Sequence, residues 1–353
     1  MKSLYATETY LQHYHHVKRQ MRRHRAYFAA GVYVPIGPSG RIYRAVAAPV
    51  ADVPFGRGWE SHQHPLKFVM KALVAPPFAL IRGTGKHCRA TVAFAGGGQE
   101  LIAYDAANKF VIRMPESTRY SVRYERLRQA YSMSVPTPRF SINAARSVLI
   151  EDYVDGVSLG DLPPAERSFA IANVLRAFIR LGQEQGQTAK SYAVISSYVM
   201  RASRLGLTTR VSPLRSLQQR LLQWCSRLPM VPSQSDLHPG NVICKGDAFR
   251  VVDWPTAEHF VAERPWCYDP MTILIRGKLR ETALLFQGSY DHILAPMYKR
   301  LWVEGGDLST IRSFLTLVWL LTHADRKADD GRGDDGFAVA LLEDWSKLQG
   351  FVR

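Results

Sequence analysis

The chain has 353 residues, a length that corresponds to two or three domains and excludes a small disulfide-stapled scaffold. With 46% hydrophobic and 22% charged residues, the composition is that of a globular protein and excludes a disordered chain or a repetitive fibre. The 46 Lys and Arg residues outnumber the 30 Asp and Glu residues. The resulting net charge of +16 favours an anionic partner such as phosphate, nucleic acid or a membrane surface.

The cysteines and the apolar stretches predict a cytoplasmic protein. The four cysteines are far apart and form no C-x-x-C pair, so neither a disulfide framework nor a zinc site is indicated. The first residues carry no apolar segment typical of a secretory leader, and no apolar stretch is long and uninterrupted enough to span a bilayer.

Residues 1–89 are expected to form a basic N-terminal extension. Residues 1–90 contain 14 Lys and Arg residues and only three acidic residues, so this part holds most of the excess charge. The segment 5–28 lacks Gly and Pro and predicts a helix with several cations and a thin apolar complement. The cations are Lys18, Arg19, Arg22, Arg23 and Arg25, and the apolar residues are Leu11, Val17 and Met21. Such a helix is either a solvated surface element or a peripheral contact with an anionic membrane at its inner face.

A β-rich segment is expected from Ala90 onward. The predicted strands are Thr91–Ala95, Glu100–Tyr104, Lys109–Met114 and Ser147–Tyr153. Gly96-Gly97-Gly98 forms the first turn, and a charged helix is expected over Ser117–Tyr131. We expect this β-rich unit to cover residues 90–156.

The chain becomes mostly helical after Pro163. The predicted helices are about 165–183, 190–204, 213–227, 267–276, 281–303, 307–323 and 336–348. A small β-rich unit followed by a larger helical one, over 157–353, predicts an α+β fold.

The segment Pro232–Ala257 contains the residues best suited to catalysis. Asp236 is followed five positions later by Asn241, and Asp253 comes directly after an apolar strand. Two short strands around the Lys245-Gly246-Asp247 turn predict a hairpin that brings Asn241 and Asp253 together. One carboxylate and one amide oxygen suit Mg²⁺ bound to phosphate, and Asp236 could accept a proton beside it. The alternative is a polar turn between two structural strands.

These residues resemble the catalytic loop and metal-binding strand of the aminoglycoside phosphotransferase and choline kinase group, relatives of the protein kinases. The resemblance lies in D-L-H-P-G-N and V-V-D-W. It implies a bilobal protein-kinase-like fold with a small β-rich N-lobe and a larger helical C-lobe. It also implies that Asp236 is the catalytic base, that Asn241 and Asp253 bind magnesium on the phosphates of ATP, and that His238 and Pro239 shape the loop.

The same resemblance assigns nucleotide-binding positions in the β-rich unit: Gly96, Gly97, Gly98, Arg113, Glu125, Glu151 and Tyr153. Arg113 would contact the α and β phosphates, and Glu125 would position it. Backbone groups from Glu151 to Tyr153 would receive the adenine. Asp269, in the family's D-P segment, would support the catalytic loop from the following helix.

Several positions leave alternatives open. The family usually has His-Gly before the catalytic Asp, where this chain has Gln234-Ser235, and Arg113 replaces the commoner lysine. The glycine turn could be a plain hairpin turn, and Glu125 could pair with Arg128 on its own helix. Trp254 and Trp266 could stack on substrate or pack beneath the loop.

The sequence therefore predicts an ATP- and magnesium-dependent phosphotransferase, a kinase that moves the γ-phosphate to a hydroxyl of a small molecule, sugar or glycan-lipid. The alternative is a kinase-like nucleotide-binding protein with weak or no transfer activity. No RNA-binding signature accompanies the basic charge, so no specific nucleic-acid partner is expected. An acidic cleft facing Asp236 would favour a cationic acceptor, and a basic or neutral polar cleft would favour phosphorylated sugars or glycans.

Overall fold

The computed structural model describes residues 15–36, 42–45, 79–82, 88–95, 100–114, 135–143, 148–185, 191–211, 214, 224–225, 227–254, 263–301, 307–328 and 333–351. The chain divides into two compact units. Unit 1 comprises Met1–Tyr124 and Pro138–Tyr153, and unit 2 comprises Glu125–Thr137 and Val154–Arg353. Unit 1 is built on a β-sheet and unit 2 is mainly helical, which confirms the predicted α+β class.

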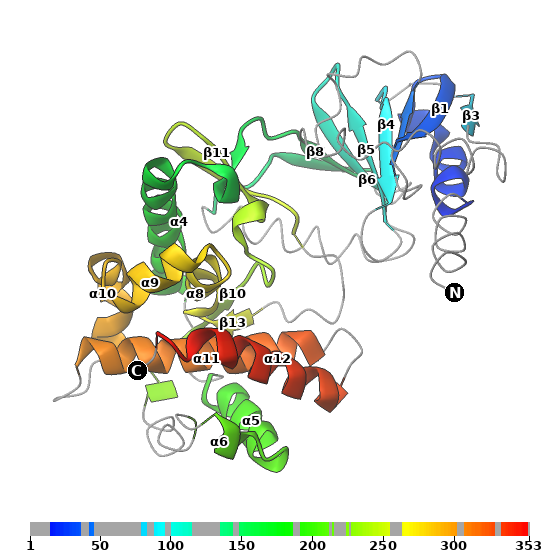
Figure 1. Ribbon diagram of the computed structural model, residues 1–353. Helices are drawn as coiled ribbons and strands as arrows, with labels where there is room; N and C mark the ends of the chain where they lie inside the picture. The colour runs from blue at the N-terminus through cyan, green and yellow to red at the C-terminus, as the bar shows by residue number, and fades with distance from the viewer. Residues whose placement is uncertain are drawn as a thin grey trace. The chain divides into compact units, whose positions relative to one another are not determined.

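Unit 1 contains an eight-stranded antiparallel sheet (Figure 1). The strands are β1 (Gly31–Ile36), β2 (Ile42–Ala45), β3 (Ala79–Ile81), β4 (Val92–Ala95), β5 (Leu101–Asp105), β6 (Phe110–Met114), β7 (Phe140–Asn143) and β8 (Val148–Asp152). Their order in the sheet is β3-β1-β2-β4-β5-β6-β8-β7. The four strands predicted from Ala90 onward correspond to β4, β5, β6 and β8, with ends within one residue of the prediction.

The predicted separation of residues 1–89 from the β-rich unit is wrong for the described part of that segment. Strands β1–β3 belong to the same sheet, and β2 pairs with β4 through partners such as Tyr43 and Ala93. Residues 15–23 are helical, and their Val17 and Met21 are fully buried in the unit 1 core. The apolar side of this helix therefore packs within the protein, while Arg22 and Arg23 are exposed. The reason is that apolar residues scattered through this basic segment complete one side of the sheet's core.

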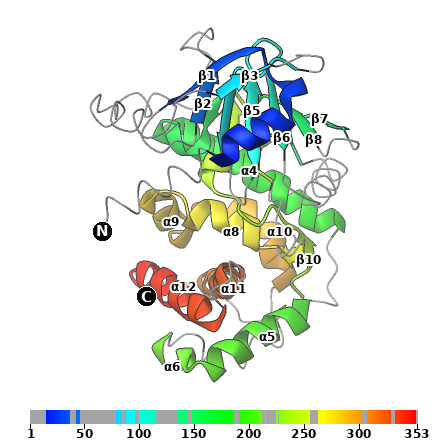
Figure 2. The ribbon, with the colours of Figure 1, turned by 90° about the vertical axis from the view of Figure 1, so that its right-hand side faces the viewer.

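The described residues of unit 2 form helices, a two-stranded sheet (β10-β13) and a three-stranded sheet (β12-β11-β9). The helices are α4 (Pro164–Gln185), α5 (Ser191–Arg204), α6 (Leu207–Arg210), α8 (Tyr268–Ile275), α9 (Leu279–Phe286), α10 (Asp291–Leu301), α11 (Leu308–Ala328) and α12 (Gly333–Leu348). The strands are β9 (Val157–Ser158), β10 (Met230–Pro232), β11 (Val242–Lys245), β12 (Ala248–Val251) and β13 (Glu263–Pro265). In both views α12 lies alongside α11 (Figures 1 and 2).

The single helix predicted over residues 281–303 is two helices, α9 and α10. Gly288 lies between them with a φ of 82°, a left-handed conformation that glycine adopts at low cost. The N–H of Gly288 donates to the carbonyl of Leu285, and the N–H of Ser289 donates to that of Leu284. These bonds close the end of α9, which periodicity alone did not show.

Two tryptophans near the predicted site pack into the core. The indole of Trp266 is 1% exposed and donates to the carbonyl of Phe178 on α4, 3.0 Å away. A Cβ at Gly182 would lie 1.9 Å from the Trp266 Nε1 atom, so only glycine permits this approach. Trp254 is 4% exposed and donates to the carbonyl of Val251. Among the described helices none is long and apolar enough to cross a membrane.

Candidate active site

The β11–β12 hairpin places Asn241 beside Asp253, as the sequence predicted. In this hairpin Val242 pairs with Val251. One position further out, the N–H of Val252 donates to the carbonyl of Asn241 at 2.9 Å. Asp253 is the next residue, so the amide and the carboxylate emerge from the same end of the hairpin.

Gln234 connects the Asp236 loop to the Asp253 segment. Its side chain is fully buried. The Oε1 atom accepts a hydrogen bond from the N–H of Asp236 at 2.8 Å, and Nε2 donates to the carbonyl of Asp253 at 3.0 Å. Sequence reasoning noted Gln234 only as a departure from the family pattern. The structure shows that one buried amide fixes the backbone on both sides of the candidate site.

Asp269 supports the Asp236 loop from the following helix, as expected for the D-P segment. It lies in the first turn of α8, where its carboxylate accepts hydrogen bonds from Ser233 Oγ and from the N–H of Gln234, both at 3.0 Å. Burial raises the pKa of Asp269 to about 6, and these donors partly oppose that rise. The N–H of Ser235 in turn donates to Ser233 Oγ at 2.9 Å, so one carboxylate organises three consecutive residues.

His238 has the predicted loop-shaping role. Its Nδ1 atom accepts a hydrogen bond from the N–H of Gly240 at 3.0 Å, which caps the short 3-10 turn Pro239–Asn241. A Cβ at Gly240 would lie 2.7 Å from His238 Cε1, so glycine lets the imidazole fold over the turn. Burial lowers the pKa of His238, which favours the neutral ring that can accept this bond.

Backbone strain is concentrated at the candidate site. Three described non-glycine residues have positive φ, and two of them are Ser235, at 66°, and Asp253, at 54°. Left-handed conformations cost non-glycine residues about 1–3 kcal/mol each and persist where the surroundings hold them. Here the Gln234 and Asp269 hydrogen bonds supply that restraint on the two segments.

The donor atoms at the end of the hairpin fit a magnesium ion bound to phosphates. Asn241 Nδ2 donates to the carbonyl of Asp236 at 3.1 Å, which leaves the amide oxygen as the atom of that side chain that could ligate a metal. The Asp253 side chain is exposed. Among the described residues no group of three or more His, Cys, Asp or Glu side chains could hold a metal. One carboxylate and one amide oxygen would suit Mg²⁺, because this ion keeps waters and phosphate oxygens as its other ligands.

Two arginines that the sequence reasoning did not identify contact the carboxylate of Asp236. Arg276 Nη1 donates to Oδ1 at 2.8 Å, and Arg326 Nη2 lies 2.9 Å from the same atom. Arg326 is 5% exposed on α11, a helix with a long apolar segment. A cation on the buried stripe of an apolar helix is the signal that could have identified it.

In unit 1, Arg113 lies between two carboxylates. Its Nε atom donates to Glu151 Oε2 at 2.9 Å, and its Nη1 atom lies 3.3 Å from Glu100 Oε2. All three side chains are buried. Glu125, the predicted partner of Arg113, and Gly96-Gly97-Gly98 lie outside the described residues.

The backbone predicted to receive adenine belongs to β8 and the residue after it, and β8 lies between β6 and the edge strand β7 of the same sheet. Glu151 pairs with Val111 of β6 and with Phe140 of β7. The N–H of Tyr153 donates to the carbonyl of Lys109 at 2.7 Å, and its ring lies 4.9 Å from that of Tyr104. These contacts place Glu151 within the sheet and Tyr153 directly after strand β8.

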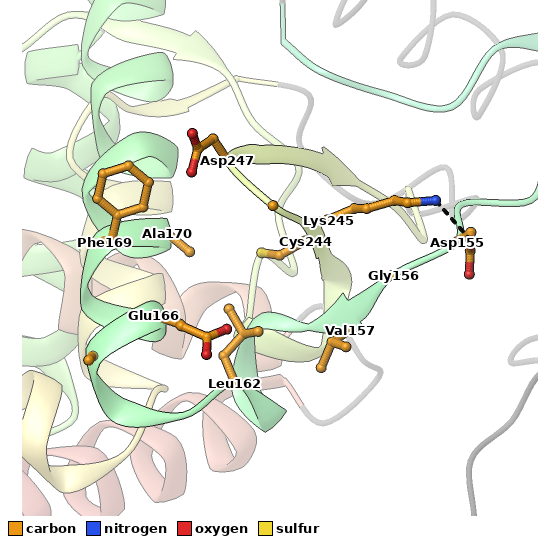
Figure 3. Close-up of a pocket in the computed structure, with 12 residues that line it drawn as sticks. Asp155, Gly156, Val157, Leu162, Glu166, Phe169, Ala170, Cys244, Lys245 and Asp247 are labelled. Atoms are coloured by element: carbon orange, nitrogen blue, oxygen red, sulfur yellow. Dashed lines mark hydrogen bonds and ion pairs between the residues drawn. The ribbon is translucent and has the colours of Figure 1, made fainter.

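A cavity of about 630 Å³ lies between the start of α4 and the tip of the β11–β12 hairpin (Figure 3). Its lining includes the acidic residues Asp155, Glu166 and Asp247, and Lys245 Nζ reaches Asp155 at 3.0 Å. None of Asp236, Asn241 and Asp253 lines it. This cavity is therefore separate from the candidate catalytic residues.

Comparison with known proteins gives structural similarities only. No protein-family model matches the chain, and no curated protein matches it. The chain is similar to a choline/ethanolamine kinase family protein from Mesorhizobium loti, with 17% identity over 72% of this chain and 86% of the other, at a TM-score of 0.46.

Two antibiotic phosphotransferases are similar to a comparable extent. They are the aminoglycoside phosphotransferase APH(3'')-Id from Streptomyces rimosus in complex with ADP and streptomycin (16% identity, 65% and 92% coverage, TM-score 0.41) and the macrolide 2'-phosphotransferase MphH from Brachybacterium faecium (13% identity, 69% and 87% coverage, TM-score 0.42). These structures come from the group that the sequence motifs indicated. At these TM-scores, the activity has to be argued from the residues of this chain.

Proposed function

We propose that the chain is a phosphotransferase that transfers the γ-phosphate of ATP to an acceptor hydroxyl, with Asp236 as the base. The observation that carries this proposal is the restraint on the Asp236 loop: Gln234 connects Asp236 to Asp253, and Asn241 Nδ2 binds the carbonyl of Asp236. A structural turn has no need for two strained non-glycine residues. A site that fixes a base beside metal ligands does.

Each of these residues has a defined task in the proposed reaction. Asn241 and Asp253 would hold magnesium, which when bound neutralises charge on the phosphates. The Asp236 side chain, 32% exposed, is open enough to accept a hydrogen bond from the acceptor hydroxyl. As the hydroxyl oxygen forms its bond to the γ-phosphorus, the bond to the bridging oxygen of ADP breaks and the hydroxyl proton passes to Asp236.

The nucleotide contacts proposed in unit 1 rest on the sequence resemblance. Arg113 remains the proposed phosphate contact, although its described contacts already give it a structural role between Glu100 and Glu151. The roles of Gly96, Gly97, Gly98 and Glu125 in ATP binding are likewise proposals, as is contact of the N-terminal arginines with an anionic membrane.

Asp253→Ala tests the proposed activity most directly. We expect magnesium-dependent ADP release, measured with a panel of hydroxylated acceptors, to fall at least about a thousandfold because the carboxylate ligand is lost. Asp247→Ala, an exposed acid in the turn of the same hairpin, is the matched control and should leave turnover unchanged. Equal turnover in Asp253→Ala and the wild type would refute the assignment.

A second candidate is a kinase-like protein that binds nucleotide but transfers phosphate poorly. The observation that favours it is the pair of guanidinium groups on Asp236 Oδ1, because both compete with an acceptor hydroxyl for that oxygen. Thermal stabilisation by ATP and magnesium, without ADP release for any acceptor, would select this candidate over the transferase.

A further inference from the structure

The cavity beside α4 in unit 2 has a wall that backbone contacts hold in place. Val157 of β9 pairs with Cys244 of β11, which joins the segment before α4 to the hairpin. A Cβ at Gly156 would lie 2.4 Å from the carbonyl oxygen of Cys244, so only glycine permits this approach. Ser158 Oγ donates to the carbonyl of Pro239 at 3.2 Å, which connects the same segment to the turn before β11. A wall already in place lets a ligand bind without first ordering the chain.

The size and the apolar lining of this cavity suit a small organic molecule. Clefts that hold small ligands usually have volumes of about 300–1,000 Å³ and a mostly apolar lining, and this cavity measures about 630 Å³. Phe169 and Val157 line it and are 52% and 48% exposed, although both side chains are large and apolar. A ligand with an apolar body would cover these two side chains and remove their surface from water.

The charged side chains of the lining are mainly acidic. Asp155, Glu166 and Asp247 line the cavity, and Lys245 is the one cation among the described lining residues. Lys245 Nζ lies 3.0 Å from Asp155. Figure 3 shows the Lys245 side chain extended toward this acid and away from α4. The side of the cavity formed by α4 therefore faces a ligand with an acid and without a described cation.

Glu166 is the acid on that side. It lies in the first turn of α4 and is exposed, and no ion pair or side-chain hydrogen bond recorded for the described residues involves it. The neighbouring Arg167 is 5% exposed and has its Nη1 atom 3.6 Å from Glu281 of α9, so its charge is directed into the core. The start of a helix attracts anions, and here the carboxylate of Glu166 already supplies the negative charge.

We propose that this cavity binds a small organic cation, an ammonium or amidinium group on an apolar body. Glu166 pairs with the cation, and Phe169 and Val157 contact the apolar body. A hydrogen bond between a cation and a carboxylate is roughly twice as strong as one between neutral groups, and the face of an aromatic ring also attracts a cation. An anionic ligand would meet like charges instead. None of the three candidate catalytic residues lines the cavity, so this ligand is distinct from the acceptor of the proposed phosphotransferase.

Three ligands of similar size test the class of molecule. We would titrate the full-length protein with benzylammonium, benzyl alcohol and benzoate and follow each ligand by saturation-transfer NMR. The expected Kd of benzylammonium is at least about tenfold below that of benzyl alcohol, because only the cation gains a charge-assisted hydrogen bond. Equal or tighter binding of benzyl alcohol or benzoate would overturn the inference, as would a failure of benzylammonium to bind at millimolar concentration. The titrations contain no ATP, so their result is independent of the proposed phosphotransferase activity.

Glu166→Gln tests the partner assigned to the cation. This variant should bind benzylammonium at least about tenfold more weakly than the wild type, with the binding of benzyl alcohol unchanged. Glu184→Gln changes an exposed acid at the other end of α4. It is the matched control and should keep the wild-type preference. An unchanged preference in Glu166→Gln, or an equal loss in Glu184→Gln, would refute the role given to Glu166.

A second variant tests whether the ligand occupies the cavity. Ala165→Trp introduces a large side chain at an exposed position of the lining, and it should abolish the binding of both benzylammonium and benzyl alcohol. Ala193→Trp, at an exposed position of α5, is the control and should bind both ligands as the wild type does. Wild-type binding in Ala165→Trp would show that the ligand binds elsewhere and would refute the assignment of the cavity.

Discussion

The two charged clusters of this protein are opposite in composition. In unit 1 a single arginine, Arg113, lies between Glu100 and Glu151. In unit 2 a single aspartate, Asp236, is contacted by Arg276 and Arg326. The first cluster places one guanidinium group between two carboxylates and the second places one carboxylate between two guanidinium groups.

This difference indicates different tasks for the two clusters. All three members of the Arg113 cluster are buried, at 7% exposure or less, so its charges mainly stabilise one another within the sheet. The Asp236 cluster combines a buried Arg326 with a half-buried Asp236 and Arg276, so a ligand can reach it. A cluster that is buried throughout mainly stabilises the fold, whereas one with accessible members is open to a ligand.

The largest expected difference between the clusters is in stability. Arg113→Met leaves two buried glutamates without their cation, which should lower the free energy of unfolding by about 3–5 kcal/mol. Urea unfolding followed by circular dichroism measures this loss. The triple variant with Glu100→Gln and Glu151→Gln should recover most of it, and Arg139→Gln, at an exposed position in the same unit, should cost little. A loss below about 1 kcal/mol in Arg113→Met would show that the cluster has no such role.

The burial of His323 should appear in the pH dependence of stability. The folded-state pKa of His323, about 2, lies far below its usual value of 6.5, so only the unfolded chain takes up a proton between pH 6.5 and 4. Stability is therefore lost as the pH falls through this range, by about 3 kcal/mol at pH 4. In His323→Gln this part of the acid sensitivity should disappear.

The control for this pH dependence is His292→Gln. His292 is exposed on α10, and its replacement should leave the wild-type loss between pH 6.5 and 4 intact. Tryptophan fluorescence during urea unfolding at both pH values reports the change. An equal acid-dependent loss in His323→Gln and the wild type would show that burial and the neighbouring cations do not keep this ring neutral in the folded protein.

The smallest expected effect compares one strained residue in each unit. Ser235 in unit 2 and Lys109 in unit 1 have φ values of 66° and 55°. Glycine relieves the left-handed strain but loses more backbone entropy on folding, so Ser235→Gly and Lys109→Gly should each gain about 0.5–1 kcal/mol in thermal unfolding. Only Ser235→Gly should also alter kcat, because its strain positions the Asp236 loop. If Lys109→Gly also changed kcat, the strain at Ser235 would have no special role in activity.

The local parts of the fold and of the site could be predicted from the sequence. Apolar runs bounded by turn residues gave strands β4, β5, β6 and β8 closely. The hairpin that joins Asn241 to Asp253 followed from two strands and a Lys245-Gly246-Asp247 turn. The loop-shaping role of His238 was predictable for the same reason: the residues involved are neighbours in the chain.

The parts that sequence reasoning missed depend on distant contacts. Arg276 is 40 residues from Asp236 in the chain, and Arg326 comes from a different helix again. Likewise, β2 pairs with β4 across a long intervening segment. The net charge of residues 1–89 had suggested an appended segment, but the described part of it contributes strands to the sheet. Neither spacing nor composition reports which distant elements pack together.

The pairing of β2 with β4 also limits how the N-terminal region can be studied. A chain beginning at Ala90 would leave β4 as an open edge, with unpaired backbone groups able to recruit other chains. It would also lose the aromatic side chains of Tyr27, Phe28 and Tyr33 that are buried in the unit 1 core. Such a fragment would be prone to aggregate, and aggregates sediment or float with vesicles for reasons unrelated to lipid binding. Charge reversal at Arg22 and Arg23, which leaves the sheet intact, is the informative way to examine membrane contact.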